Sequence, residues 1–331
     1  MLKQGKLTNT QLEELVLNKI INKNEETVVG AGIGEDCCAV KIKGGMCVVS
    51  TDPITASNEQ TGELAIYINA NDIAAAGAIP IAALVTLLIP PSAQDDDIKK
   101  VIDQLTSTAS NMNIDIIGGH TEITDSVNRI IVSVAMIGKP VIENKMFKTS
   151  DMKIGEDILM TKYAGIEGTT IIANDFLSEL KNQFHVLDYV QLEEIRNSLS
   201  VVKDGAAAAK LDVSAMHDIT EGGVIGAICE MCEASHTGAD IDFSKVPVMD
   251  VTKKICKYYD LDVYGLISSG SMIITTSDGE AVVHELSAQG IKATMIGKVT
   301  KKGVFDVSNN KRKAVSAYQS DELYKVIEKK R

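Results

Sequence analysis

Three aspartates stand where a carboxylate could hold a metal ion. Asp36 follows a glycine-rich loop, Asp52 ends an apolar run, and Asp72 lies inside the small-residue run 69–80. Asn69 precedes Asp72 by three residues, so the two side chains share one face of a predicted helix. Proteins commonly hold Mg²⁺ with one or two carboxylates together with phosphate oxygens of a substrate. If the fold brings the three aspartates together, they predict a magnesium-assisted phosphate site.

Two glycine-containing turns could direct backbone N–H groups at phosphate oxygens. One contains Gly32 and Gly34, and the other contains Gly165 and Gly168 and is preceded by Lys162, whose ammonium group could supply a point charge. A strand-to-helix turn with a surface lysine explains the second nearly as well. No Gly-x-x-x-x-Gly-Lys-Ser/Thr motif occurs, and no helix follows the first turn, so a P-loop and a dinucleotide fingerprint are disfavoured.

Four segments, in their order along the chain, resemble the AIR synthase (PurM) superfamily of ATP-using enzymes. Residues 72–80 read Asp-x-x-x-x-Gly-Ala-x-Pro, and residues 34–36 and 50–52 are similar to the family's Gly-Asp-Asp and Ser-Thr-Asp segments. Residues 216–223 read Met-His-Asp-Ile-Thr-Glu-Gly-Gly. This last segment resembles the second-domain motif in the form closest to hydrogenase maturation protein HypE, so the HypE-like, AIR synthase-related branch is indicated.

The resemblance extends from about Leu12 to about Val307 and implies an α+β fold of two PurM-like domains. We place an ATP-binding domain at 1–150 and a C-terminal α/β sandwich at 151–331. The resemblance also implies ATP and Mg²⁺ as cofactors, with Asp36, Asp52 and Asp72 as metal ligands. Relatives pair two N-terminal sheets, which predicts a homodimer.

Site residues follow from the same resemblance. Gly118, Gly119 and His120 fall where members carry Gly-Gly-Asp-Thr, so the glycines, with Asn69 and the two turns above, are expected at the nucleotide. His120 departs from the acidic form and could bind metal less avidly, donate to a phosphate, or act as an acid or base. Asp218 and Glu221 are expected to face the nucleotide from the second domain, and with His120 they are our candidate catalytic groups.

Three further features bear on the mechanism. His217 is expected to point away from Asp218, since neighbours alternate in an extended segment. Ser269 stands where HypE proteins carry a glutamate, and no cysteine follows Cys256, whereas HypE proteins end in a cysteine-bearing tail. We therefore expect a small separate substrate in place of the protein's own tail.

The function implied is an ATP- and Mg²⁺-dependent enzyme that activates an oxygen of this small molecule by phosphoryl transfer. One alternative is a phosphotransferase resembling thiamine-monophosphate kinase. Another is a non-catalytic nucleotide-binding partner in a protein maturation complex. The retained aspartates favour the enzyme, whereas His120 and Ser269 favour the partner.

Composition narrows the function classes. The net charge of −12 and pI near 5.0 argue against nucleic-acid or anionic-membrane partners. The longest apolar run, about 79–89, is too short to cross a bilayer, and no charged-then-apolar leader opens the sequence, so a soluble cytoplasmic protein is expected. The six cysteines show no disulfide framework. Cys229 and Cys232 lie in a predicted helix over 224–234, where buried thiols are the simplest interpretation.

The predicted strands and helices that would position the candidate site residues follow one another without strict βαβ alternation, which favours α+β domains. Glycines at 44 and 45 predict a hairpin, and its second strand, 46–50, needs a partner at its edge. The expected helices span about 10–22, 58–76, 95–112, 224–234 and 279–289. The expected strands include 38–42, 46–50, 81–88, 115–117, 130–137, 155–162, 263–266, 271–275 and 293–299.

Overall fold

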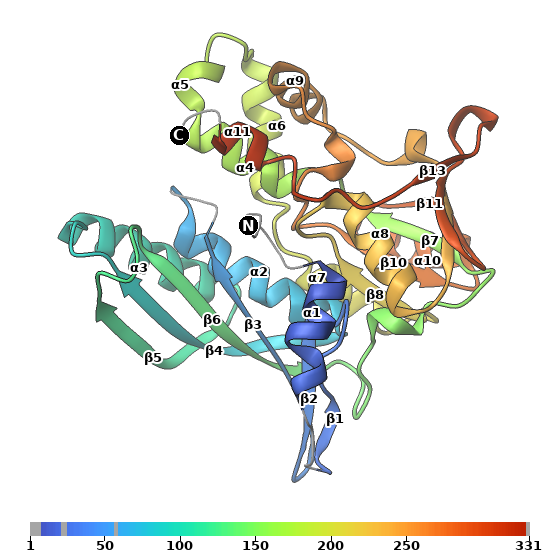
Figure 1. Ribbon diagram of the computed structural model, residues 1–331, viewed down its shortest axis with the longest axis horizontal. Coiled ribbons are helices and arrows are strands. Elements are labelled where there is room, and N and C mark those ends of the chain that lie inside the picture. The colour runs from blue at the N-terminus through green and yellow to red at the C-terminus, as the bar shows by residue number, and fades with distance from the viewer. Residues whose placement is uncertain (1–7, 21–24, 56–58, 329–331) are drawn as a thin grey trace.

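Two β-sheets with helices packed on them make up the computed structural model, which describes residues 8–20, 25–55 and 59–328 (Figure 1). The end of the helix expected at 10–22 and the start of the one expected at 58–76 lie outside these residues. Within them, the helices are α1 (Asn9–Leu15) and α2 (Thr61–Ala75). Thr8 accepts a hydrogen bond from the Gln11 N–H and so caps α1.

The first sheet has the strand order β1-β2-β3-β6-β4-β5. Every pairing in it is antiparallel except that of β4 with β5. Helix α2 packs on β3, β4 and β6, and α3 (Asp95–Asn111) packs on α2. The strands are β1 (Thr27–Val29), β2 (Cys37–Ile42), β3 (Gly45–Ile54), β4 (Ala78–Ile89), β5 (Asp115–Ile123) and β6 (Ile131–Pro140).

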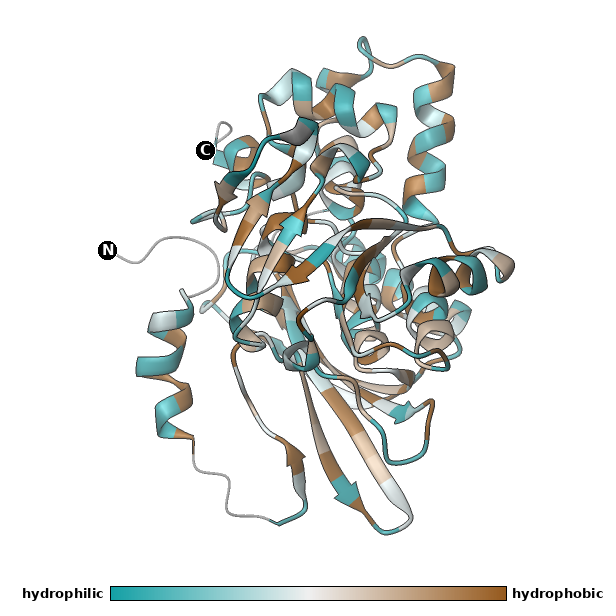
Figure 2. Ribbon diagram, turned by 90° about the vertical axis from the view of Figure 1, so that its right-hand side faces the viewer, coloured by the Kyte–Doolittle hydropathy of each residue, from teal (hydrophilic) through white to brown (hydrophobic). Residues whose placement is uncertain are grey.

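The opposite face of this sheet keeps apolar side chains exposed. The ribbon in Figure 2 shows hydrophobic residues, in brown, along strands of the molecule. They include Val40, Ile42, Ile79, Ile81 and Leu84. Monomeric proteins rarely leave so continuous an apolar surface in water. The helices therefore cover only one of the two faces of the first sheet.

The second sheet has the strand order β13-β12-β9-β11-β7-β10-β8 and lies between helices on both faces. Alternate residues of β7 show this arrangement: Ile158 and Met160 pack with α8, whereas Leu159 packs with α7 and α10. The strands are β7 (Asp157–Thr161), β8 (Ala215–Asp218), β9 (Gly238–Ile241), β10 (Met272–Thr276), β11 (Ala293–Thr300), β12 (Gly303–Asp306) and β13 (Lys313–Val315); the helices are α4 (Ile166–Asp175), α5 (Leu177–Leu180), α6 (Val186–Arg196), α7 (Val202–Ala208), α8 (Gly223–Ala234), α9 (Asp250–Tyr259), α10 (Gly279–Ala288) and α11 (Tyr324–Glu328). The expected α/β sandwich is confirmed.

Helix α2 joins the two halves of the molecule. The buried Asn71 amide donates to the Leu199 carbonyl at 2.8 Å and accepts from the Val201 N–H at 2.8 Å, which places α2 against the start of α7. Gly205 of α7 lies so close that a Cβ there would be 2.2 Å from the Ala74 oxygen. The face of α2 that carries the site residues is thereby fixed between the two sheets.

Three expected elements differ in the structure. Residues 263–265, expected as strand, form a 3₁₀ helix, because the Asp262 side chain accepts from the Tyr264 N–H and starts a turn. Strand β5 continues to Ile123, beyond the expected 115–117. Helix α1 ends at Leu15, short of the expected length. Among the described residues, we find no helix that combines the length and apolar character required to span a bilayer.

Candidate functional site

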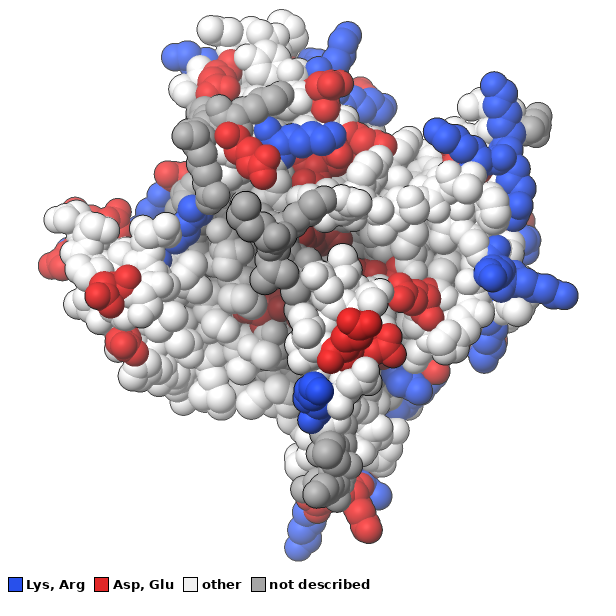
Figure 3. Space-filling view, in the orientation of Figure 1, with Lys and Arg blue, Asp and Glu red and all other residues white. Residues whose placement is uncertain are grey.

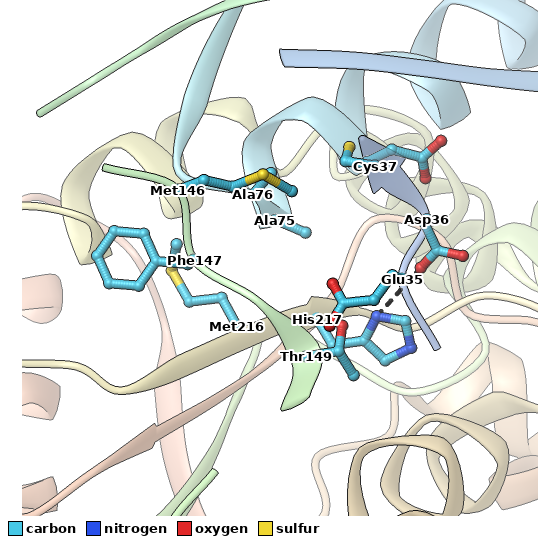
Figure 4. A pocket seen from close by; sticks show the side chains of 11 residues that line it. Glu35, Asp36, Cys37, Ala75, Ala76, Met146, Phe147, Thr149, Met216 and His217 are labelled. Carbon is cyan, nitrogen blue, oxygen red and sulfur yellow. Dashed lines mark ion pairs between the residues drawn. The ribbon is translucent and has the colours of Figure 1, made fainter. Parts of the chain in front are cut away.

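A small cavity between the two domains brings together residues that are far apart in the sequence (Figure 4). Its volume is about 10 Å³, enough for about one water molecule. The start of β2, the C-terminal end of α2, the segment before β7 and strand β8 all contribute to its wall. The lining residues are Glu35, Asp36, Cys37, Asp72, Ala75, Ala76, Met146, Phe147, Thr149, Met216 and His217.

Asp36 is presented by the glycine loop before β2. Gly34 takes a φ of +71°, and a Cβ there would lie 3.5 Å from the Glu230 carbonyl oxygen of α8, so the loop crosses close to that helix. Glu35 accepts a hydrogen bond from the Ser150 N–H at 3.3 Å. Burial raises the pKa of Glu35, an effect that its bonds to the 149–150 segment partly offset. The loop is thus held to both domains where it carries Asp36.

Asp72 and Asn69 lie on α2, as the spacing predicts, but they act on different partners. Asp72 is buried and lines the cavity. The buried Asn69 amide accepts from the Asp52 N–H at 2.8 Å and donates to the Asp52 and Ala65 carbonyls. Asp52 of β3 is therefore fixed, through its backbone, against the helix that carries Asp72. The roles of Asp36, Asp52 and Asp72 as metal ligands stay a prediction.

Strand β8 delivers His217 and Asp218 to the same place. Each of Asp36, His217 and Asp218 offers one ligand atom, and these atoms lie within 4.8 Å of one another. The expectation that His217 points away from Asp218 is therefore wrong: both residues belong to β8, yet their ligand atoms lie close together beside Asp36. Both side chains are almost fully buried.

Two carboxylates hold the His217 ring. Its Nδ1 lies 3.3 Å from Asp36 Oδ2, drawn as the dashed line in Figure 4, and its Nε2 lies 3.2 Å from Glu230 Oε2 of α8. Burial alone would lower the pKa of His217, but Glu230, Asp36 and Asp218 outweigh it and raise that pKa to about 9. Burial, Asp72, Asp36 and Asp218 keep Cys37 a thiol by raising its pKa.

Further carboxyl groups lie behind Asp218 in the second domain. Asp321, from the segment before α11, accepts hydrogen bonds from the Gly222 N–H at 2.6 Å and the Leu323 N–H at 2.8 Å. Burial raises the pKa of Asp321 to about 7 and that of Glu167 on α4 to about 7. The negative charge of Glu221 raises both pKa values further. Glu221, a candidate catalytic group, thus belongs to a cluster of acids whose mutual repulsion disfavours full ionisation.

The second predicted phosphate turn lies at the start of α4. Gly165 adopts a left-handed conformation as the N-cap, and its N–H donates to the Ser268 hydroxyl at 2.6 Å. A Cβ on Gly168 would lie 2.5 Å from Leu266, so this glycine permits close packing. Lys162 is half-buried, and its Nζ donates to the Ser200 carbonyl at 2.6 Å and lies 3.4 Å from Asp204. A phosphate bound by Lys162 would have to compete with these two oxygens.

The Gly118-Gly119-His120 segment lies apart from these residues within one chain. It sits in β5, at the edge of the first sheet and four strand positions from β2, which corresponds to roughly 19 Å. A Cβ on Gly119 would lie 1.8 Å from the Val85 oxygen, so β4 and β5 approach closely there. The exposed His120 ring lies 3.4 Å from Glu122. Any role of this segment at the site of Asp36 stays a prediction and requires a second chain.

Charge is distributed unevenly over the face shown in Figure 3. Acidic side chains appear in the hollow at the centre of this face, whereas most of the Lys and Arg side chains lie toward its edge. The thiols outside the cavity are buried or half-buried and all six cysteines are free. Burial raises the pKa of Cys229 to about 11 and of Cys232 to about 12, which agrees with inert thiols.

Sequence reasoning missed His217, Glu230, Glu167 and Asp321 as members of this region. The only signal for His217 was its place beside Asp218 in the 216–223 segment. Glu230 lies on the helix that follows this segment. Asp321 lies far from any motif in the sequence. It reaches Gly222 only because the chain returns to this region before α11.

Comparisons with known proteins identify related sequences. The AIR synthase related protein N-terminal domain profile matches residues 34–139, and the corresponding C-terminal domain profile matches residues 153–308. A protein of Methanocaldococcus jannaschii assigned to hydrogenase expression/formation is 28% identical over 312 residues, covering 88% of this chain and 89% of the relative. The carbamoyl dehydratase HypE of Rhizobium leguminosarum is 24% identical over 277 residues, covering 80% of this chain and 77% of that protein.

Solved structures share the fold. A chain of the HypE–HypF complex has a TM-score of 0.75 at 20% identity, covering 93% of this chain and 99% of that one. HypE in complex with ATP has a TM-score of 0.71 at 18% identity, and 97% of each chain is covered. The kinase ThiL complexed with AMPPCP and TMP has a TM-score of 0.69 at 18% identity, covering 87% of this chain and 92% of that one. With both domain profiles matched in order over one continuous fold, the chain belongs to the AIR synthase related family.

Proposed function

We propose that this protein is an ATP- and Mg²⁺-dependent enzyme that activates an oxygen of a small separate substrate by phosphoryl transfer. The observation that carries the proposal is that Asp36 and Asp72, from a loop and a helix, line one cavity, and that a ligand oxygen of Asp218, from strand β8, lies within 4.8 Å of one of Asp36. A fold shared with HypE in complex with ATP supports the use of ATP.

The donor chemistry fits Mg²⁺, because carboxylate oxygens are the ligands that this ion prefers. Asp36, Asp72 and Asp218 would hold it, with Asp52 on the adjoining strand. When bound, the ion would neutralise charge on the phosphates. The chain's own part is to orient these carboxylates through the Asn69 clamp and the glycine loop, and to shield them between the domains.

Calorimetry of ATP binding, in EDTA and in Mg²⁺, tests the metal requirement. An acidic chain needs a cation to accept a triphosphate, so we expect at least 10-fold tighter binding in Mg²⁺ and loss of that gain in Asp72→Asn. Asp103→Asn, on the exposed face of α3, is the matched control and should bind as the unaltered protein does. Equal ATP affinity in both buffers would rule out the metal-bridged arrangement.

The main alternative is a nucleotide-binding partner without catalysis. Ser269, at the position of a HypE glutamate, favours it, and the HypE–HypF complex supports a protein partner in maturation. ATP turnover by the purified protein, alone and with candidate acceptors, separates the alternatives. Binding without phosphate release under every condition would favour the partner over the enzyme.

A further inference from the structure

The environment of His217 is unusual for a site intended for magnesium alone. Mg²⁺ is held by oxygen ligands, and imidazole nitrogen suits Zn²⁺, iron and nickel better. Yet the His217 ring reaches into the carboxylate cluster, where Nδ1 lies 3.3 Å from Asp36 Oδ2. One ring nitrogen, one Asp36 oxygen and one Asp218 oxygen all lie within 4.8 Å of one another. Figure 4 shows the ring directed at Asp36, beside the small cavity.

The second ring nitrogen provides an independent observation. Nε2 lies 3.2 Å from Glu230 Oε2 and can donate its proton to that carboxylate. A cation that displaced the Nδ1 proton would then meet the Nδ1 lone pair on the side of Asp36. Histidines that bind metal in proteins almost always donate their other N–H to a carboxylate, carbonyl or water in this way. Glu230 comes from α8, a different element from the three ligands, and the His217 side chain is only 2% exposed.

We propose that Asp36, His217 and Asp218 form a three-ligand site for a divalent transition metal, with Glu230 orienting the imidazole. Two carboxylates and one imidazole leave coordination positions open, and the cavity of about 10 Å³ beside them has room for about one water molecule. The site shares Asp36 and Asp218 with the proposed nucleotide site. Its test uses metal without nucleotide, so its failure would leave the proposed ATP use standing.

Pulsed EPR of Mn²⁺ bound to the untagged, EDTA-treated full-length protein is the direct test. We expect the ¹⁴N modulation of one directly bound imidazole, and its replacement by a ¹⁵N signal when the histidines are isotopically labelled. His217→Gln should lose the modulation and bind Mn²⁺ and Zn²⁺ at least 10-fold more weakly by calorimetry. His284→Gln, at a ring 82% exposed on α10, is the control and should retain both properties.

Glu230→Gln separates orientation from ligation. It should keep the nitrogen modulation but weaken Mn²⁺ binding by about 10-fold or more, since loss of an orienting carboxylate lowers metal affinity without removing a ligand. Bound Mn²⁺ without nitrogen modulation in the unaltered protein would overturn the proposal, and this measurement does not depend on whether His217→Gln folds. Unchanged metal affinity in a folded His217→Gln would also overturn it.

Discussion

At the residue scale, the buried carboxyl of Glu167 couples the stability of the second domain to pH. Its pKa is about 7 in the folded protein, from burial and from the nearby Asp321, Asp218 and Glu221, against an ordinary 4.5. The folded state therefore holds a proton that the unfolded chain releases. This contribution to stability is fully present below about pH 4.5 and is lost as the pH rises through about 7.

We expect the free energy of unfolding in EDTA to fall between pH 5.5 and pH 8, by about 2 kcal/mol from a group shifted this far. Glu167→Gln, which is neutral at both pH values, should flatten this dependence. Urea denaturation at the two pH values measures it. Glu280→Gln, on the exposed face of α10, should leave the slope as it is. An unchanged slope in Glu167→Gln would contradict the assigned shift.

At the element scale, α2 determines the geometry of the site because it packs closely on both sheets. Its small residues, such as Ala74, allow Gly205 of α7 to pack closely. A Cβ on Gly205 would lie 2.2 Å from the Ala74 backbone oxygen. The two backbones must separate to accommodate any side chain at position 205. Since Asn71 and Asp72 lie on the same helix, such a movement would also disturb the cavity.

Gly205→Ala should therefore destabilise the protein by about 2 kcal/mol, as overpacking of a close contact does, and should weaken Mg²⁺-dependent ATP binding in parallel. Urea denaturation and calorimetry measure the two effects. Lys203→Ala, on the exposed side of α7, should change stability by less than about 0.5 kcal/mol. If Gly205→Ala lowered neither quantity, α2 would not be the rigid support described here.

The elements around α2 were predictable from sequence because their signals are local. Alanine-rich spacing and the glycine hairpin predicted α2, β2 and β3, and the spacing of Asn69 and Asp72 placed both on one helix. The pairing of Asp36 with His217 was not predictable, since it depends on how the glycine loop crosses α8. Likewise, residues 263–265 have a β-rich composition, but the Asp262 cap overrides it.

At the scale of the whole molecule, the uncovered face of the first sheet and the position of His120 indicate the same missing component. Apolar side chains such as Ile81 and Leu84, 46% and 42% exposed, lie on β4, next to the edge strand that carries His120. Within one chain, His120 lies far across the sheet from Asp36. A second copy of this chain, packed face to face, would cover the apolar surface and could bring its His120 to the first copy's site.

We therefore predict a homodimer with twice the 35.5 kDa mass of one chain, measurable by light scattering at micromolar concentration. Leu84→Lys places a charge in the apolar face and should yield a folded monomer that binds ATP at least 10-fold more weakly, since its site lacks the partner's contribution. Val186→Lys, at a side chain 80% exposed on α6, introduces the same charge elsewhere and should remain dimeric. His120→Ala should stay dimeric yet lose ATP affinity. A monomer that binds ATP as tightly as the dimer would show that each chain builds its nucleotide site alone.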